Sequence, residues 1–249
     1  MYDLKGKVAL VTGSSLGLGR EFALGLARAG ASVVVNNRKG GELAEAVVKE
    51  IRDMGRQAIL VTCDVGDPKS VSEMVDAVLA RFKKVDILVN NAGISIDGFT
   101  VNLDPEDWDR VLKTNISGVF YCTKYCLASM IEQNWGRVIH IGSAAGQRGI
   151  IGTPAYTASK AALIGFTKTV AREVARKGIT VNCIALGYFS GGGLLDTVPE
   201  KLAEGILARI PAGRWGKSEE ITSTVNYLAS ELGGYITGQT INVNGGYYM

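Results

Sequence analysis

The 249-residue chain contains a single histidine, five prolines and four cysteines. One histidine excludes the imidazole clusters that many zinc and iron sites use, and the cysteines show no C-x-x-C spacing. Cys122 and Cys126 share a predicted helix face, which leaves a metal site conceivable. We interpret all four cysteines as small buried residues and expect no metal.

Charge of one sign and long apolar runs are scarce as well. The 27 basic and 24 acidic residues leave a net charge of +3 without a basic block, so nucleic-acid or membrane binding gains no support. No 18 uncharged apolar residues run together, and the N-terminus lacks a signal-peptide cleavage pattern. We therefore expect a cytoplasmic protein with a globular composition, 47% hydrophobic and 20% charged.

Short apolar runs alternate with helical patterns along the whole chain. Strands are predicted at residues 7–12, 32–37, 57–62, 86–90, 137–142, 179–184 and 239–243. Helices or helical pieces are predicted at residues 41–54, 67–82, 105–133, 154–170, 194–210 and 218–230. Because no linker or repeat interrupts this alternation, the sequence predicts one doubly wound α/β domain over residues 1–249.

A glycine-rich turn follows the first predicted strand and opens a helix. The backbone N–H groups of such a turn, together with the helix N-terminus, suit a pyrophosphate group. The position of the turn between a strand and a helix strengthens an otherwise weak glycine pattern. The predicted dinucleotide contacts in this turn are Gly13, Ser15, Leu16, Gly17, Leu18 and Gly19.

The end of the second predicted strand bears on the choice of cofactor. An NAD-binding domain usually places Asp or Glu here on the ribose hydroxyls, whereas this chain has Asn37 and Arg38. A carboxylate would repel a 2′-phosphate, and a guanidinium binds one with paired hydrogen bonds. The sequence therefore favours NADP(H) and leaves NAD(H) open. The alternative for Arg38 is a solvated surface charge.

Polar and small residues also follow or interrupt other elements. Asp64 either accepts a hydrogen bond from an adenine amino group or caps a local turn. The segment 90–93, Asn-Asn-Ala-Gly, lets a flat ligand approach the backbone. Asn115 lies among apolar residues and needs partners, either backbone groups or a water in a proton path. We interpret His140, inside a predicted strand, as a packed and hydrogen-bonded core residue.

Tyr156 and Lys160 are one helical turn apart, so their side chains share a face. A phenol beside an ammonium group is stabilised as phenolate, and we expect the Tyr156 pKa to fall from near ~10 toward working pH. Such a group exchanges protons with alcohols and carbonyls. Ser143 stands at the carboxyl end of a predicted strand, where ligands bind in open α/β sheets. Taken alone, the pair is also compatible with an ordinary amphipathic helix.

Together, these motifs resemble the short-chain dehydrogenase/reductase family over essentially the whole chain. The matching motifs are Thr12-Gly13-x-x-x-Gly17-x-Gly19, Asn90-Asn91-Ala92-Gly93, Asn115, Ser143 and Tyr156-x-x-x-Lys160. Within the family, the chain is most similar to 3-oxoacyl-[acyl-carrier-protein] reductases and related small ketone or sugar-acid reductases. The resemblance implies a Rossmann-type seven-stranded parallel sheet with helices on both faces, and a homotetramer.

The resemblance also implies roles for individual residues. Tyr156 would be the general acid/base and Ser143 would orient the substrate oxygen. Lys160 would bind the nicotinamide ribose and lower the Tyr156 pKa, while Asn115 would hold a relay water. The other implied cofactor contacts are Asn37, Arg38, Asp64, Val65, Asn91, Ala92, Gly93, Gly187 and Phe189. The implied reaction is hydride transfer between nicotinamide and a ketone or secondary alcohol, such as a 3-oxoacyl thioester.

The segment 185–212 is expected to form the substrate lid, and four glycines within 185–193 predict that it is mobile. Leu186 and Gly191 replace a Pro and a Thr that are usual in such reductases, which predicts a looser lid and a less firmly held carboxamide. The expected substrate contacts are Ser95, Ser143, Gln147, Ile150, Ile151, Tyr188 and Phe189. Arg148 is either a carboxylate clamp or a surface charge.

Two other functions stay open. The altered loop favours a dinucleotide-binding regulatory protein with weak catalysis. A sugar or polyol dehydrogenase that uses NAD is the second alternative. A nucleotide-sugar epimerase usually carries a further C-terminal substrate domain, for which 249 residues leave little room.

Overall fold

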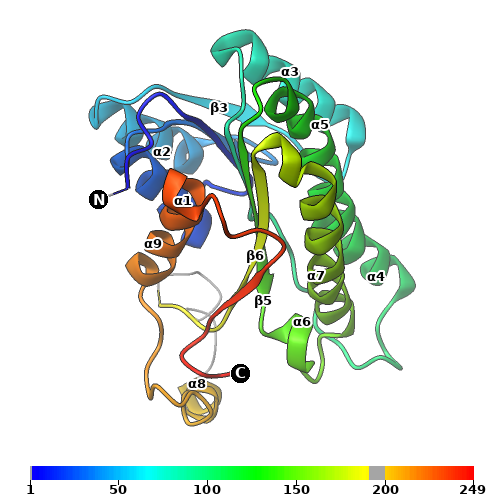
Figure 1. Cartoon of the computed structure of the whole chain (residues 1–249). Coiled ribbons are helices and arrows are strands. Elements are labelled where there is room, and N and C mark those ends of the chain that lie inside the picture. The colour runs from blue at the N-terminus through cyan, green and yellow to red at the C-terminus, as the bar shows by residue number, and fades with distance from the viewer. Residues whose placement is uncertain (1, 191–199) are drawn as a thin grey trace.

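A parallel β-sheet forms the centre of the molecule (Figure 1). The computed structural model describes residues 2–190 and 200–249. Within them, seven strands pair in the order β3-β2-β1-β4-β5-β6-β7, which confirms the predicted fold class. The strands are β1 Val8–Val11, β2 Ser32–Asn37, β3 Ala58–Thr62, β4 Ile87–Asn90, β5 Gly136–Ser143, β6 Ile179–Leu186 and β7 Thr240–Val243.

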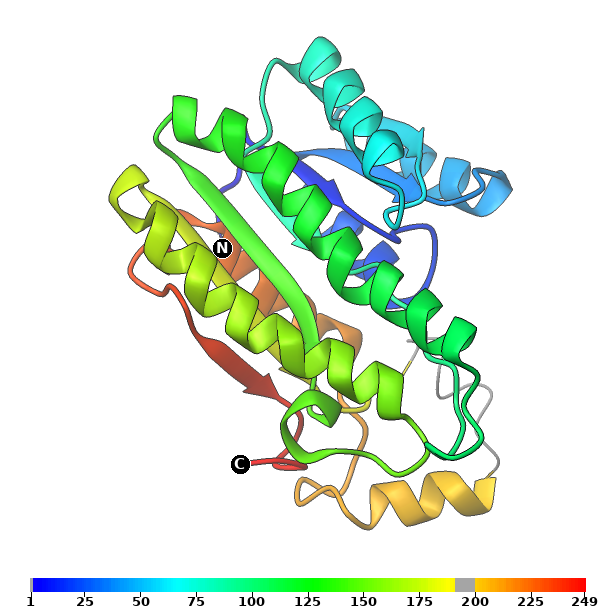
Figure 2. The ribbon, with the colours of Figure 1, turned by 90° about the vertical axis from the view of Figure 1, so that its right-hand side faces the viewer.

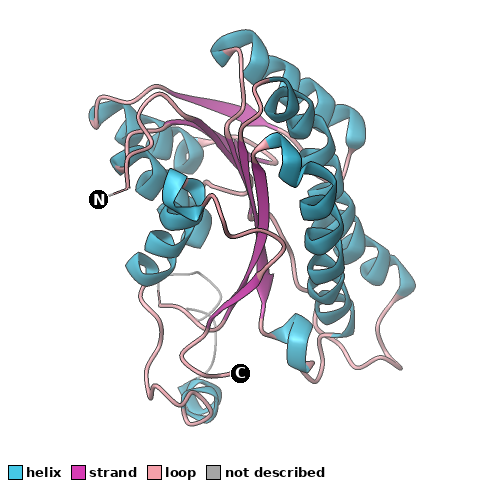
Figure 3. Ribbon diagram, viewed as in Figure 1, coloured by secondary structure: helices cyan, strands magenta, loops and turns pink. Residues whose placement is uncertain are grey.

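Helices cover both faces of the sheet (Figure 3). One layer contains α1 Gly17–Arg28, α2 Glu42–Asp53 and α9 Ser218–Ala229. The other contains α3 Pro68–Phe82, α4 Pro105–Leu112, α5 Gly118–Glu132 and α7 Pro154–Val174, and Figure 2 shows α3, α5 and α7 side by side. Two short helices, α6 Ala145–Arg148 and α8 Glu200–Leu207, lie beyond the carboxyl ends of the strands.

The strands are buried on both sides, as their near-continuous apolar sequences require. Successive residues of a strand point to opposite faces, so Leu10 and Val34 join the cluster under α3, α5 and α7, whereas Val11 and Val35 join the cluster under α1, α2 and α9. No helix among the described residues is both long and apolar enough to cross a membrane.

The interpretation of the cysteines and of His140 as core residues is confirmed. All four cysteines are buried and unpaired, and burial raises the pKa of Cys126 to about 12. His140 is fully buried in β5, where its Nδ1 lies 3.1 Å from the amide nitrogen of Asn90. Burial lowers the His140 pKa to about 3, so the ring is neutral at physiological pH.

The predicted helical region 105–133 is not one regular helix. A π-helical turn, Lys113–Ser117, separates α4 from α5. Such turns often occur at functional sites, and this one carries Asn115, which is fully buried. In the other predicted helical segment, 194–210, the described part contains α8, and residues 194–199 lie outside the described residues.

Asp86 joins the entry of β4 to β1. Its buried carboxylate accepts a hydrogen bond of 2.7 Å from the Val8 N–H and pairs with Lys84 at 2.9 Å. Asp86→Ala would leave a buried N–H without its acceptor, which should lower the free energy of unfolding by about 1–3 kcal/mol in urea denaturation. Asp53→Ala is the control, because this exposed carboxylate pairs only with exposed Lys49 and should cost less than about 0.5 kcal/mol. Equal losses for both variants would contradict the role of Asp86.

Candidate active site

Three predicted site residues lie at the carboxyl edge of the sheet. Ser143 ends β5, and Tyr156 and Lys160 lie in the first two turns of α7. The Lys160 ammonium nitrogen is 5.6 Å from the centroid of the Tyr156 ring and donates a hydrogen bond of 2.7 Å to the Ile141 carbonyl. α6 packs closely on this turn of α7, because a Cβ atom at position 146 would lie only 2.5 Å from the Lys160 carbonyl carbon. The local packing therefore holds lysine and tyrosine next to the end of β5.

Burial makes the protonated form of Lys160 less stable. The side chain is almost wholly removed from water, and this desolvation lowers its pKa to about 8. At pH 7 the group remains mostly protonated. Because its ammonium group is shielded from water, Lys160 would interact strongly with a negative charge that forms beside it.

The expectation for the Tyr156 pKa is wrong in direction. Burial raises the pKa of Tyr156, and a hydrogen bond with Ser143 lowers it only in part. The sequence argument considered the neighbouring ammonium and left out the desolvation of the phenol, which is the larger effect here. Tyr156 is consequently a protonated phenol at neutral pH, which suits it to donate a proton.

Asn115 uses its side chain to hold backbone. Its Oδ1 accepts a hydrogen bond of 2.8 Å from the Ile94 N–H, and its Nδ2 donates to the Ile94 carbonyl at 2.9 Å. The second Nδ2 proton goes to the Ser159 hydroxyl at 3.0 Å. The backbone partners that the sequence left open are therefore present, together with the Ser159 hydroxyl. The sequence analysis missed Ser159, and its only signal was its place between Tyr156 and Lys160.

The glycine turn is joined to the segment after β4. The Thr12 hydroxyl accepts hydrogen bonds from the Asn91 and Ala92 N–H groups, both at 3.0 Å. In return, the Asn91 amide donates to the Thr12 and Gly13 carbonyls at 2.9 and 3.0 Å. A Cβ atom at position 19 would lie 2.2 Å from the Gly13 carbonyl oxygen. The absence of a side chain at Gly19 is therefore a steric requirement of this turn.

Other predicted residues of this region differ in exposure. Leu16, at the N-cap of α1, is 57% exposed, and Leu18 is partly buried against the core. Gly17 has a φ of +56°, in the left-handed region that favours glycine. Gly93 faces the catalytic side, since a Cβ atom there would lie 3.3 Å from the Asn115 Oδ1 and 3.5 Å from the Lys160 Nζ.

The carboxyl end of β2 contains a buried asparagine that the sequence analysis missed. The Asn36 Oδ1 accepts a bond of 3.3 Å from the Gly13 N–H, and its Nδ2 donates to the Val61 carbonyl at 3.1 Å. Asn36 thus links the glycine turn to β3. Its neighbour Asn37 bonds in both directions with the Gly40 backbone, at 2.7 and 3.0 Å.

Arg38 and Asp64 lie at the ends of β2 and β3, respectively, and both are exposed. The Asn37 amide is engaged with its own loop. The guanidinium of Arg38 is the first cationic group after the end of β2. The Asp64 carboxylate accepts a bond of 2.9 Å from the Gly66 N–H, which is the turn-capping alternative. Val65, between Asp64 and Gly66, is buried.

The side chains of Arg148, Tyr188, Trp215 and Tyr247 form an aromatic and cationic wall. The Tyr188 ring meets the Trp215 and Tyr247 rings edge-on, at centroid distances of 5.9 and 5.3 Å. The Arg148 guanidinium lies 4.2 Å from the centre of the Tyr247 ring and donates to its carbonyl at 3.3 Å. Burial raises the pKa of Tyr188. Trp215 and Tyr247 carried no signal in the sequence, since folding alone brings them beside Tyr188.

The first part of the predicted lid is held by neighbouring backbone. The Gly187 N–H donates to the Val243 carbonyl at 3.0 Å, and the Gly216 N–H donates to the Tyr188 carbonyl at 2.9 Å. The Phe189 ring is buried, in the space that a side chain at position 216 would fill. The looser lid predicted from Leu186 stays a prediction. Gly191 and the mobility predicted for 191–193 lie outside the described residues.

The remaining predicted substrate contacts differ in their partners. Exposed Ser95 donates to Asp97 at 2.9 Å. The Gln147 Oε1 is a buried atom without a hydrogen-bond partner among the described residues. Ile151 is 87% exposed and Ile150 is partly buried. Among residues 2–190 and 200–249, no three His, Cys, Asp or Glu side chains gather as a metal site would require.

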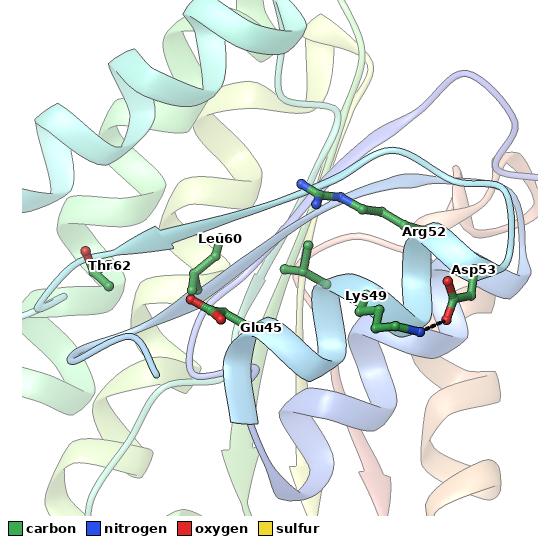
Figure 4. Close-up of a pocket in the computed structure, with 7 residues that line it drawn as sticks. Glu45, Lys49, Arg52, Asp53, Leu60 and Thr62 are labelled. Carbon is green, nitrogen blue, oxygen red and sulfur yellow. Dashed lines mark hydrogen bonds and ion pairs between the residues drawn. The ribbon is translucent and has the colours of Figure 1, made fainter. Parts of the chain in front are cut away.

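A groove of about 660 Å³ lies elsewhere, between α2 and the edge strand β3 (Figure 4). Its lining is mostly charged, and Lys49 pairs with Asp53 at 2.7 Å within it. The Arg52 guanidinium donates to the Ala58 carbonyl at 2.8 and 3.1 Å. Lys49, Asp53 and Arg52 therefore already have hydrogen-bond partners in the protein. None of the predicted site residues lines the groove.

The arrangement at the carboxyl edge agrees with comparisons to known proteins. The chain matches the short chain dehydrogenase family over residues 7–201. It is 44% identical over 250 residues to a 3-oxoacyl-[acyl-carrier-protein] reductase of Synechocystis sp., with full coverage of both chains. A Staphylococcus aureus protein of the same description is 43% identical over 98% of both chains.

A solved structure described as a putative short-chain alcohol dehydrogenase from Sinorhizobium meliloti superposes with a TM-score of 0.92. It shares 36% identity, over 98% of this chain and 97% of that one. The chain therefore belongs to the short-chain dehydrogenase family, and it is an oxidoreductase that acts on CH–OH or ketone groups with NAD(P).

Proposed function

We propose that this protein reduces a ketone to a secondary alcohol with NADPH, or runs the reverse reaction, with Tyr156 as general acid/base. A 3-oxoacyl thioester or a similar small carbonyl compound is the proposed substrate class, as the names of the relatives suggest. The observation that carries the proposal is the meeting of Ser143, Tyr156 and Lys160 beside the braced glycine turn.

The residues at the edge fit a dinucleotide. Gly13 and Gly19 keep two close-packed positions of the turn free of side chains, and Asn91 holds the turn in place. Its N–H groups and the N-terminus of α1 would bind the pyrophosphate. Gly93 would let the nicotinamide half approach Lys160. The bound cofactor supplies the hydride that reaches the carbonyl carbon.

The protonation state of Tyr156 identifies it as the source of the proton in the proposed reduction. Its raised pKa keeps the phenol protonated at neutral pH, so Tyr156 gives its proton to the carbonyl oxygen as the C=O bond becomes CH–OH. Ser143 orients that oxygen by a hydrogen bond. The phenolate left behind is stabilised by the Lys160 ammonium, which is desolvated and therefore interacts strongly with a new negative charge.

We propose that the substrate contacts the aromatic and cationic wall. Tyr188, Trp215 and Tyr247 provide an aromatic surface, and Arg148 adds a positive charge at its rim. Residues 1–249 would act as one catalytic domain. We also propose a cytoplasmic homotetramer, which the exposed Phe120 and Ile131 on α5 support as apolar contact surface.

Two alternatives make different predictions. A regulatory protein with weak catalysis would bind the cofactor without turnover. A sugar or polyol dehydrogenase would prefer NAD and polyhydroxy alcohols. Steady-state assays with a diketone and with polyols, each with both cofactors, separate these functions.

Tyr156→Phe removes the proton donor and keeps the ring. We expect kcat for reduction of a reactive diketone to fall by roughly 10²–10⁴-fold, while NADPH affinity stays within about threefold. The absorbance of the reduced cofactor measures turnover, and fluorescence titration measures binding. Tyr235→Phe, on a fully exposed ring, is the control. Nearly full activity in Tyr156→Phe would remove Tyr156 from the mechanism.

Arg38→Ala tests the cofactor choice. Losing a charge-assisted contact to the 2′-phosphate should weaken NADPH binding by about 10- to 100-fold and leave NADH binding unchanged. Lys39→Ala, which removes the adjacent exposed charge, is the control. The 2′-phosphate proposal fails if Arg38→Ala weakens both dinucleotides equally.

Gly19→Ala tests the glycine turn. The new methyl group would meet the Gly13 carbonyl and the Asn91 amide, at 2.2 and 2.5 Å, so the turn must move. We expect a loss of dinucleotide affinity of at least about tenfold in the same titration. Gly165→Ala in α7 is the matched control, since nothing lies within 4 Å of its added Cβ atom. That variant should bind normally and gain about 0.5–1 kcal/mol of stability. Normal binding by Gly19→Ala would contradict the cofactor location.

A further inference from the structure

Ser159 occupies a central position in the hydrogen bonds behind the proposed catalytic tyrosine. The residue is completely buried in α7. Its hydroxyl is 3.0 Å from the Asn115 Nδ2 and 2.7 Å from the Tyr156 carbonyl oxygen. An amide NH₂ only donates, so the Ser159 oxygen accepts from Asn115 and its single proton goes to Tyr156. Both directions are thus determined by chemistry.

The Asn115 end of this chain of bonds is firmly anchored. The amide exchanges two hydrogen bonds with Ile94, at 2.8 and 2.9 Å, just after β4. The π-helical turn Lys113–Ser117 places the Asn115 side chain in this buried position. Ser159 therefore connects the main chain of Tyr156 to two segments that are distant in sequence.

The Tyr156 end needs such a connection. Tyr156 lies in the first turn of α7, where backbone N–H groups have no partner within the helix and the helix ends fray. The N-cap residue, Thr153, provides no side-chain cap to this turn. Its hydroxyl bonds to the Ile150 carbonyl at 3.1 Å and lies 3.2 Å from the Thr157 hydroxyl. The backbone N–H groups of the first turn therefore gain no acceptor from the cap side chain.

We propose that Ser159 is a positioning residue, which holds the first turn of α7 so that the Tyr156 hydroxyl stays aligned with Ser143 and the substrate oxygen. The inference rests on the proposed role of Tyr156. Proton transfer demands close alignment, and a misplacement of about 1 Å can cost on the order of 10²-fold in rate. Loss of this support should therefore reduce turnover more than it reduces binding.

Ser159→Ala removes only the hydroxyl group. We expect kcat for diketone reduction to fall by roughly tenfold or more, while the KM for NADPH and its binding constant stay within about threefold. Ser159→Cys retains a weak hydrogen-bonding group at the same place and should restore part of the lost kcat. It also tests the proposal if the alanine variant does not fold.

Thr167→Val is the matched control on the same helix. Thr167 is also fully buried and its hydroxyl donates to the Leu163 carbonyl at 2.7 Å, but this bond does not connect to Asn115 or Tyr156. Both variants lose one buried hydroxyl, and thermal unfolding should show whether their stabilities fall alike. The proposal requires that only the Ser159 variants lose kcat.

Two results would overturn the proposal: kcat of Ser159→Ala within about twofold of the parent protein, or an equal loss of kcat in Thr167→Val. Tyr156→Phe is assayed alongside. An inactive Tyr156→Phe with a fully active Ser159→Ala rejects the positioning role and leaves the proposed function intact. An active Tyr156→Phe rejects the proposed function itself.

Discussion

The Asn91 amide bridges the two central strands of the sheet, and the site depends on that bridge. β1 pairs with β2 on one side and β4 on the other, so the strand order reverses between β1 and β4. Connections leave such a point in opposite directions and open a crevice for ligands. Asn91 crosses the crevice and bonds to the Thr12 and Gly13 carbonyls. Together with the Thr12 hydroxyl, which accepts from the Asn91 and Ala92 N–H groups, this amide fixes the glycine turn against the segment after β4.

Desolvation is the second constraint, and it acts on both members of the tyrosine–lysine pair. Burial lowers the Lys160 pKa and raises the Tyr156 pKa, so each group tends toward its neutral form. Neutral His140, behind them in β5, adds no competing positive charge at physiological pH. The raised pKa of Tyr156 opposes loss of the phenol proton, and the positive charge of Lys160 would stabilise the phenolate that a proton transfer leaves.

Local sequence patterns predicted much of the fold and of the reacting groups. The strands are short apolar runs bounded by turn residues, and the spacing of Tyr156 and Lys160 requires only a regular helix. The π-helical turn had no such signal, because it is an irregularity that tertiary packing stabilises around Asn115. Ser159 and Asn36 were missed for a related reason, since their bonds reach other segments of the chain.

The wrong direction predicted for the Tyr156 pKa also arises from contacts between segments that are distant in sequence. Sequence spacing showed that an ammonium lies near the phenol, but burial depends on how α6, α7 and β5 pack together. At Gly146, α6 lies against the Lys160 main chain, and burial of the Lys160 side chain lowers its pKa. The direction of a pKa shift therefore follows from the tertiary structure even where the identity of the neighbour follows from the sequence.

The C-terminal tail extends this argument to the substrate side. Beyond β7, the Asn244 amide donates to the Tyr248 carbonyl at 3.0 Å, and the Tyr247 N–H donates to the Asn244 carbonyl at 3.1 Å. These bonds fold the tail back so that Tyr247 meets Tyr188 and supports Arg148. The candidate reacting groups lie on β5 and α7, whereas the wall combines four separate segments. If the wall contacts the substrate, as proposed, its shape depends on how α6, the segment after β6, the segment around Trp215 and the tail fold together.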